Sequence, residues 1–121
     1  MGQVVPILRI LDVARALEFY RDFLGFTVDW EHRFEPGLPL YAQLSRDGAV
    51  LHLSEHHGDG TFGAHIRIEM PGLNAYQASL MAKRYRYARP GVQNQEWGER
   101  SMSIADPFGN VVTFYERLDS A

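Results

Sequence analysis

The sequence contains no cysteine, and this absence excludes several kinds of chemistry at once. Without thiols there is no disulfide bridge, no cysteine nucleophile and no zinc site built on thiolates. The chain also lacks an apolar run long enough to span a membrane, which takes about 18 residues or more. Its first residues show no basic segment followed by an apolar stretch, so we expect no signal peptide. We therefore predict a cytoplasmic protein with no membrane partner.

The common catalytic signatures are missing as well. The five histidines do not form an H-E-x-x-H motif, and the sequence holds no nucleophile elbow, phosphate loop or dinucleotide fingerprint. The net charge of −3 argues against nucleic acid as a partner. The basic residues of Lys83–Arg89 fall at the end of a predicted helix, where the helix dipole favours cations. We interpret them as a solvated helix end and predict no nucleic-acid partner.

The first half of the chain predicts a strand, a helix and three further strands. With 121 residues and 45% hydrophobic content, the chain can bury one core without metals or disulfides. The helix begins after Asp12, a residue that caps helix N-termini, and ends before Gly25. The strands are expected at Val4–Leu11, Phe26–Phe34, Leu40–Ser45 and Ala49–Ser54. Strict alternation in the second of these puts Trp30 on the same face as Val28, so we expect Trp30 to pack in the core.

The second half repeats this order. A strand at Ala64–Met70 is followed by a helix over Leu73–Tyr87, and strands follow near Val92–Gln95, at Glu99–Ala105 and at Val111–Arg117. Two copies of a strand–helix–three-strand order indicate an internal structural repeat. We predict an α+β fold in one domain, residues 1–121, made of a first module (about 3–55) and a second module (about 62–118).

The segment Gln95–Asn110 carries the most specific pattern. It reads Gln-Glu-Trp-Gly, a short alternating strand, and then an Asp-Pro-Phe-Gly-Asn turn before the final strand. This pattern resembles the vicinal oxygen chelate superfamily, which includes glyoxalase I, extradiol dioxygenases and bleomycin-resistance proteins, and it is most similar to the bleomycin-resistance branch. The resemblance implies paired βαβββ modules with curved mixed sheets that enclose a cleft. It also implies a homodimer, because two chains pair to build the ligand sites in that branch.

The resemblance further implies four metal-ligand positions, which fall here at Val5, His52, His65 and Thr113. Valine cannot bind a metal, and a neutral hydroxyl is a poor replacement for a carboxylate. If a metal binds, His52 and His65 are its ligands, yet catalytic sites normally use at least three protein ligands. We therefore lean against an enzyme and predict no catalytic residues, no metal and no cofactor.

The candidate ligand contacts are chiefly aromatic. The resemblance implies that Trp97 stacks on the planar bithiazole of bleomycin, and its indole offers a flat apolar face with one N–H donor. The remaining candidates for ligand binding are His52, His65, Thr113, Trp30, Phe34, Phe62 and Tyr115. The leading hypothesis is a non-catalytic protein that sequesters a bleomycin-type glycopeptide at a dimer-interface cleft. The alternatives are a divalent-metal-dependent lyase, isomerase or dioxygenase of the same fold, and a fold relative that binds another small molecule.

Overall fold

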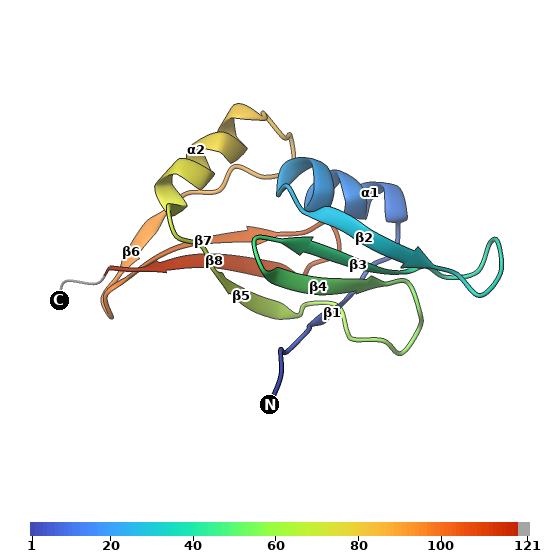
Figure 1. Ribbon diagram of the computed structural model, residues 1–121. Coiled ribbons are helices and arrows are strands. Elements are labelled where there is room, and N and C mark those ends of the chain that lie inside the picture. The colour runs from blue at the N-terminus through green and yellow to red at the C-terminus, as the bar shows by residue number, and fades with distance from the viewer. Residues whose placement is uncertain (119–121) are drawn as a thin grey trace. The chain divides into compact units, whose positions relative to one another are not determined.

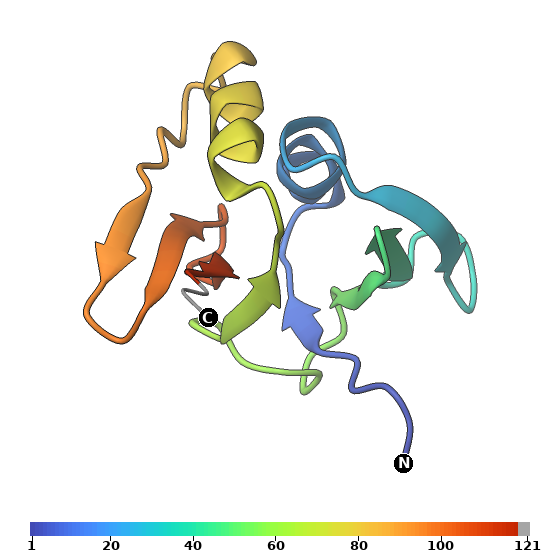
Figure 2. The same cartoon turned by 60° about the vertical axis from the view of Figure 1, so that its left-hand side comes forward.

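The protein is built from two four-stranded mixed sheets, each with helical segments on one of its faces (Figures 1 and 2). The computed structural model describes residues 1–118, so the predicted domain of 1–121 runs three residues past the described part. The chain divides into two compact units. The first unit holds Met1–Ala64 and Asp106–Asn110, and the second holds His65–Ala105 with the chain from Val111 onward. The α+β class and the mixed sheets are confirmed.

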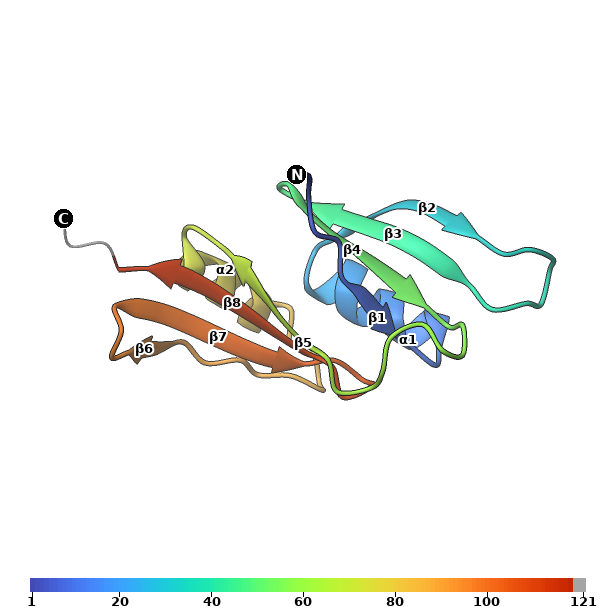
Figure 3. The same cartoon turned by 90° about the horizontal axis from the view of Figure 1, so that it is seen from below.

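The first unit contains strand β1 (Ile7–Arg9), a helical segment and strands β2 (Thr27–His32), β3 (Tyr41–Arg46) and β4 (Ala49–Ser54). The strand order is β1-β4-β3-β2, with β1 parallel to β4 and the other pairs antiparallel. Figure 3 shows these strands side by side. The β3–β4 hairpin closes at Asp47-Gly48, where both residues have positive φ (49° and 88°). That conformation is the one in which an Asp-Gly turn matches the twist of its strands.

The helical segment of this unit begins and changes pitch at defined residues. Asp12 is the N-cap of α1 (Val13–Leu17), and its side chain accepts a hydrogen bond from the Arg15 backbone N–H at 3.1 Å. The chain then continues as a π-helix, η1 (Glu18–Phe23). The wider turn brings the largest side chains to the core, including the buried rings of Phe19, Tyr20 and Phe23. Burying each such ring contributes roughly 1.5–3 kcal/mol to stability.

Strand β2 departs from the predicted alternation. Val28 pairs with Leu44, but Trp30 pairs with the adjacent Gln43, so the strand carries one extra residue at Asp29. A β-bulge of this kind moves every later side chain to the opposite face. The prediction that Trp30 shares the core face with Val28 is therefore wrong: Trp30 is 43% exposed and lies on the open face of the sheet.

The second unit contains β5 (His65–Glu69), α2 (Leu73–Ala82), β6 (Gln93–Gln95), β7 (Glu99–Ala105) and β8 (Val111–Arg117), in the sheet order β5-β8-β7-β6. One face packs its apolar side chains toward α2, and the other is polar. The β7 and β8 boundaries agree with the sequence prediction. The predicted end of α2 is wrong, because the helix ends at Ala82 instead of Tyr87.

The Asp-Pro turn stabilises the first unit as well as its own loop. Asp106 Oδ1 accepts from the backbone N–H groups of Phe108 and Asn110, each at 2.8 Å, while Oδ2 accepts from Tyr20 Oη at 2.6 Å and from Asn110 Nδ2 at 2.9 Å. Asn110 Nδ2 also donates to the Arg9 carbonyl at 3.0 Å. These bonds tie the turn to η1 and β1. In the described part of the chain, no helix combines the length and apolar character needed to cross a membrane.

Candidate functional site

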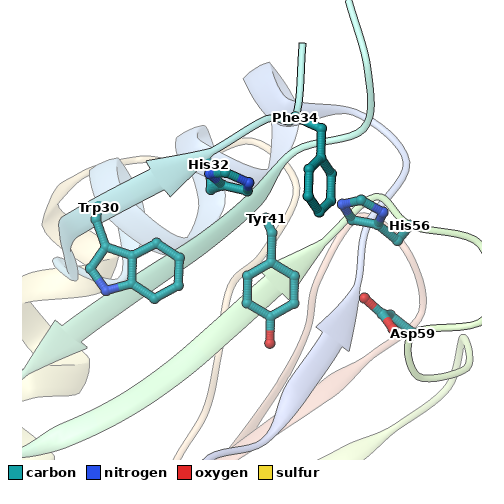
Figure 4. Close-up of a pocket in the computed structure, with 6 residues that line it drawn as sticks. All are labelled: Trp30, His32, Phe34, Tyr41, His56 and Asp59. Carbon is teal, nitrogen blue, oxygen red and sulfur yellow. The ribbon is translucent and has the colours of Figure 1, made fainter.

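The open face of the first sheet carries a pocket of about 380 Å³ (Figure 4). Ligand pockets commonly fall between about 300 and 1,000 Å³, so this volume suits a ring-sized group. β2, β3 and the loops that follow β2 and β4 supply its walls. The lining side chains are Trp30, His32, Phe34, Tyr41, His56 and Asp59.

Aromatic rings define the shape of this pocket. Trp30 and Tyr41 lie nearly parallel, with an interplanar angle of 16° and centroids 6.0 Å apart. On the other side of Tyr41, Phe34 meets the His32 ring edge-on at 4.9 Å and the His56 ring at 6.4 Å. Figure 4 shows Tyr41 between Trp30 on one side and Phe34 and His56 on the other. The pocket therefore presents several flat faces to one small volume, an arrangement that suits a planar ligand.

A directed hydrogen-bond chain holds Tyr41 in place. Gln43 Nε2 donates to Asp29 Oδ2 at 3.1 Å, which leaves Gln43 Oε1 to accept from His52 Nε2 at 3.0 Å. His52 Nδ1 lies 2.7 Å from Tyr41 Oη. Both ring nitrogens of His52 are therefore engaged in hydrogen bonds. Its role in the structure is to orient Tyr41 beneath the pocket.

Asp59 gives the pocket its charge. Its Oδ2 accepts a hydrogen bond from Ser54 Oγ at 2.9 Å, so the loop holds the carboxylate against the end of β4. Burial raises the pKa of Tyr41, and the negative charge of Asp59 raises it further. The pocket thus combines aromatic faces with one nearby carboxylate. A protonated amine or other cation on a planar group would meet attraction from both.

The predicted residues of the first unit do not all line this pocket. Trp30 and Phe34 line it directly, and His52 contacts Trp30 at a centroid distance of 5.4 Å. Phe62 is not among its lining residues and instead packs under the Arg9 guanidinium, 5.4 Å from its centroid. Val5 precedes β1 and has no polar atom in its side chain.

The predicted residues of the second unit share the polar face of its sheet. His65 Nε2 and Thr113 Oγ1 are 2.7 Å apart, and Thr113 Oγ1 also lies 2.8 Å from Ser103 Oγ. Tyr115 stacks under the guanidinium of Arg67 at 4.2 Å, and Arg67 forms an ion pair with Glu99. His65, Thr113 and Ser103 are therefore linked by hydrogen bonds on this face.

Trp97 stands apart in the turn between β6 and β7. Gly98 has a φ of 81° and donates its N–H to the Gln95 carbonyl at 3.2 Å, which closes a tight turn. Trp97 is 70% exposed and does not cap the core of its unit. An indole held at the tip of a short turn is available to stack on a ligand or on another chain.

The donors present do not fit the metal that the resemblance implies. Both nitrogens of His52 are engaged, Val5 cannot ligate, and the Thr113 hydroxyl is shared between His65 and Ser103. Among residues 1–118, no group of three or more His, Asp or Glu side chains is placed to hold a metal ion. We derive no chemical step through a metal.

The ligand contacts predicted from the sequence omit Tyr41, His32, His56 and Asp59. Tyr41 had a signal, since it lies in an alternating strand predicted from Leu40 to Ser45. His56 and Asp59 gave only a weak signal, because a Gly-containing polar loop reads as a solvated turn. Only the bulge at Asp29 and the path of the loop bring these side chains to one pocket.

Comparison with known proteins points to one superfamily. A sequence model described as "Glyoxalase superfamily protein" matches residues 1–121. A bleomycin resistance protein of Geobacillus stearothermophilus is 25% identical over 134 residues, covering 99% of this chain and all of that protein.

Solved structures share the fold at lower identity. A bleomycin-binding protein complexed with bleomycin superposes with a TM-score of 0.73 at 21% identity, covering 97% of this chain and 99% of that one. A glyoxalase-related enzyme from Clostridium phytofermentans gives a TM-score of 0.74 at 17% identity, covering 97% and 95% of the two chains. At these identities the structural comparisons show the fold alone.

Proposed function

Since this chain belongs to the glyoxalase superfamily, we propose that it binds and sequesters a planar, cationic antibiotic of the bleomycin type without chemical conversion. The proposal draws on the sequence relatives named bleomycin resistance protein and on the solved bleomycin complex of the same fold. The observation that carries it is the aromatic pocket of the first unit, with Asp59 beside Tyr41. Sequestration requires only affinity, because bound drug is removed from solution by mass action.

The charge of the first unit supports a cationic ligand. That unit holds ten Asp and Glu residues against five Arg and Lys residues, a difference of −5. Such a net charge attracts cations to this unit and raises their association rate. Asp59 then supplies the local contact, and the rings of Trp30, Tyr41 and Phe34 supply stacking area.

The absence of a fitting donor set favours binding over catalysis. His52, which the resemblance places at a metal position, instead orients Tyr41. We propose that Trp97 adds a second stacking face, with His65, Thr113 and Tyr115 contributing polar contacts, and that two copies of the chain pair as a homodimer around the ligand. Sedimentation of the protein with and without the drug tests that pairing.

The binding proposal is tested by titrating metal-stripped protein with metal-free bleomycin and following tryptophan fluorescence. The chain has two tryptophans, so Trp97→Phe reports on Trp30 alone and Trp30→Phe on Trp97 alone. We expect saturable quenching of both. Trp30→Ala should raise the Kd about tenfold, since an aromatic contact is worth about 0.5–1.5 kcal/mol and 1.4 kcal/mol is a factor of ten.

Two further variants separate stacking from charge. Asp59→Asn should weaken binding of the cationic drug, and the loss should shrink as salt is raised. Met81→Ala, at an exposed position on α2, is the matched control and should leave the Kd unchanged. No quenching at millimolar drug would refute the bleomycin proposal. Stoichiometric divalent metal that is lost in His52→Ala and His65→Ala would instead favour a metal-dependent lyase, isomerase or dioxygenase.

A further inference from the structure

A short basic segment follows α2 and plays no part in the proposed site. It runs from Lys83 to Arg89 and reads Lys-Arg-Tyr-Arg-Tyr-Ala-Arg, with four cations and two tyrosines in seven residues. We call it the basic segment. Figure 2 shows that the chain between α2 and β6 runs as an irregular stretch, without helix or strand.

The helix dipole accounts for only part of these charges. α2 ends at Ala82, Lys83 is its C-cap, and its last turn contains no basic residue. Arg84 has a φ of 52°, which turns the chain out of the helical path. The dipole acts only within the last turn of a helix, so it does not explain Arg86 or Arg89. The run begins at the helix end and is exposed, as the sequence predicts, but Arg86 and Arg89 lie beyond the reach of the dipole.

The three arginines of the basic segment have no ion-pair partner within the described chain. Among residues 1–118, no carboxylate lies within 4.0 Å of the guanidinium groups of Arg84, Arg86 or Arg89. In contrast, Arg67 and Arg100 of the same unit pair with Glu99 and Glu116.

The net charge of the whole chain conceals this local excess. The described residues of the second unit hold seven Arg and Lys residues against four Asp and Glu residues, a difference of +3. The net charge of −3, which argued against nucleic acid, therefore reflects the acidic first unit. A local cluster of cations, rather than net charge, sets attraction for a polyanion at short range.

The tyrosines indicate which polyanion fits. Tyr87 is 61% exposed, and the Tyr85 ring meets it edge-on at a centroid distance of 5.5 Å. The Arg86 guanidinium lies 5.3 Å from the Tyr87 ring centroid. Arginines beside an exposed ring match a single strand, in which phosphates meet cations and unpaired bases stack on aromatic faces. We propose that the basic segment binds single-stranded nucleic acid without strong sequence preference.

The test is a fluorescence anisotropy titration of a labelled oligothymidylate with the full chain at low salt. A strand of roughly 15 nucleotides covers the usual site size. We expect saturable binding that weakens with salt, with a slope of log K against log salt of about −2 to −3 for three to four phosphate contacts. Tyr87→Ala should raise the Kd about fivefold or more, because base stacking is lost.

Two triple variants with the same charge change provide the control. Arg84→Gln with Arg86→Gln and Arg89→Gln should abolish binding. Arg15→Gln with Arg21→Gln and Arg117→Gln removes three exposed cations elsewhere and should leave it within about twofold. Both should keep the wild-type circular dichroism spectrum and bleomycin titration, so failure of this inference is distinct from failure of the proposed function.

Several results would overturn the inference. The inference fails if the oligothymidylate does not bind at about 50 mM salt, if the two triple variants bind equally well, or if Tyr87→Ala leaves the affinity unchanged. Equal affinity for a duplex of the same length would show attraction to phosphates alone. Binding to vesicles of anionic lipid, with none to the oligonucleotide, would assign the segment to a membrane surface.

Discussion

Replacing Tyr20 with phenylalanine tests how the Asp-Pro turn is anchored to the first helix. Tyr20 is fully buried, and its hydroxyl donates to Asp106 Oδ2 at 2.6 Å. A hydrogen bond to a charged acceptor contributes about 1.5–3 kcal/mol. Asp106 Oδ2 still accepts a hydrogen bond from Asn110 Nδ2, so it is not left as an unsatisfied buried acceptor. The substitution also leaves no large void, and we expect a loss near the lower end of the range, about 2 kcal/mol.

The same substitution changes the response to alkaline pH. Burial raises the pKa of Tyr20, and the adjacent Asp106 carboxylate raises it further. A group whose pKa is raised by folding contributes stability below its unfolded pKa, about 10 for tyrosine, and loses it as the pH rises. Above about pH 10, Tyr20 therefore lowers the free energy of unfolding of the wild type by about 1.4 kcal/mol per pH unit. The variant escapes this cost, so the 2 kcal/mol gap should close near pH 11.5.

Urea unfolding followed by circular dichroism measures both effects. At about pH 7 the variant should unfold at lower urea with an unchanged m-value, and its Tm should fall by about 8 °C. Tyr87→Phe, at an exposed ring, is the control and should stay within about 0.5 kcal/mol of wild type. A gap under about 0.5 kcal/mol at neutral pH, or one that stays constant up to about pH 12, would refute the reasoning.

Three further predictions concern local features. Hydrogen bonds from the backbone N–H groups of Gly72 and Leu73 lower the pKa of Glu116, so the stability that Glu116 contributes is lost as the pH falls through that pKa. Glu116→Gln should therefore speed amide exchange at the α2 N-terminus near neutral pH but not in acid. Gly25→Ala should lower the free energy of unfolding in urea by about 1–2 kcal/mol, because φ is 90° and the new Cβ would lie 2.1 Å from Arg46 Nη1. Gly91→Ala is the control and should be nearly neutral, because its new Cβ would meet open space. Equal effects of the two substitutions would contradict this account. Asp29→Ala should loosen the bulge and weaken drug binding, because Asp29 is linked by hydrogen bonds through Gln43 to His52. Unchanged binding would show that these hydrogen bonds do not affect the pocket.

Features that depend on neighbouring residues could be predicted from the sequence. Asp12 caps the first helix because its carboxylate reaches an amide three residues away. Asp47-Gly48 closes its hairpin because both residues tolerate positive φ. Glu99–Ala105 and Val111–Arg117 were predictable as paired strands because their alternation matches the strand period and the Asp-Pro turn lies between them.

Features that depend on contacts between distant segments could be seen only in the folded chain. The bulge at Asp29 is stabilised by Gln43 and Ser45, more than ten residues away, and it moves Trp30 from the predicted core to the open face. In the pocket, the loop residue Asp59 and the strand residue Tyr41 also come together through contacts between distant segments. The end of α2 at Ala82 likewise could not be predicted from the sequence, because the residues that follow it have ordinary helix propensity. Local pattern sets which elements form, whereas side chains far apart in the chain decide which face each element presents.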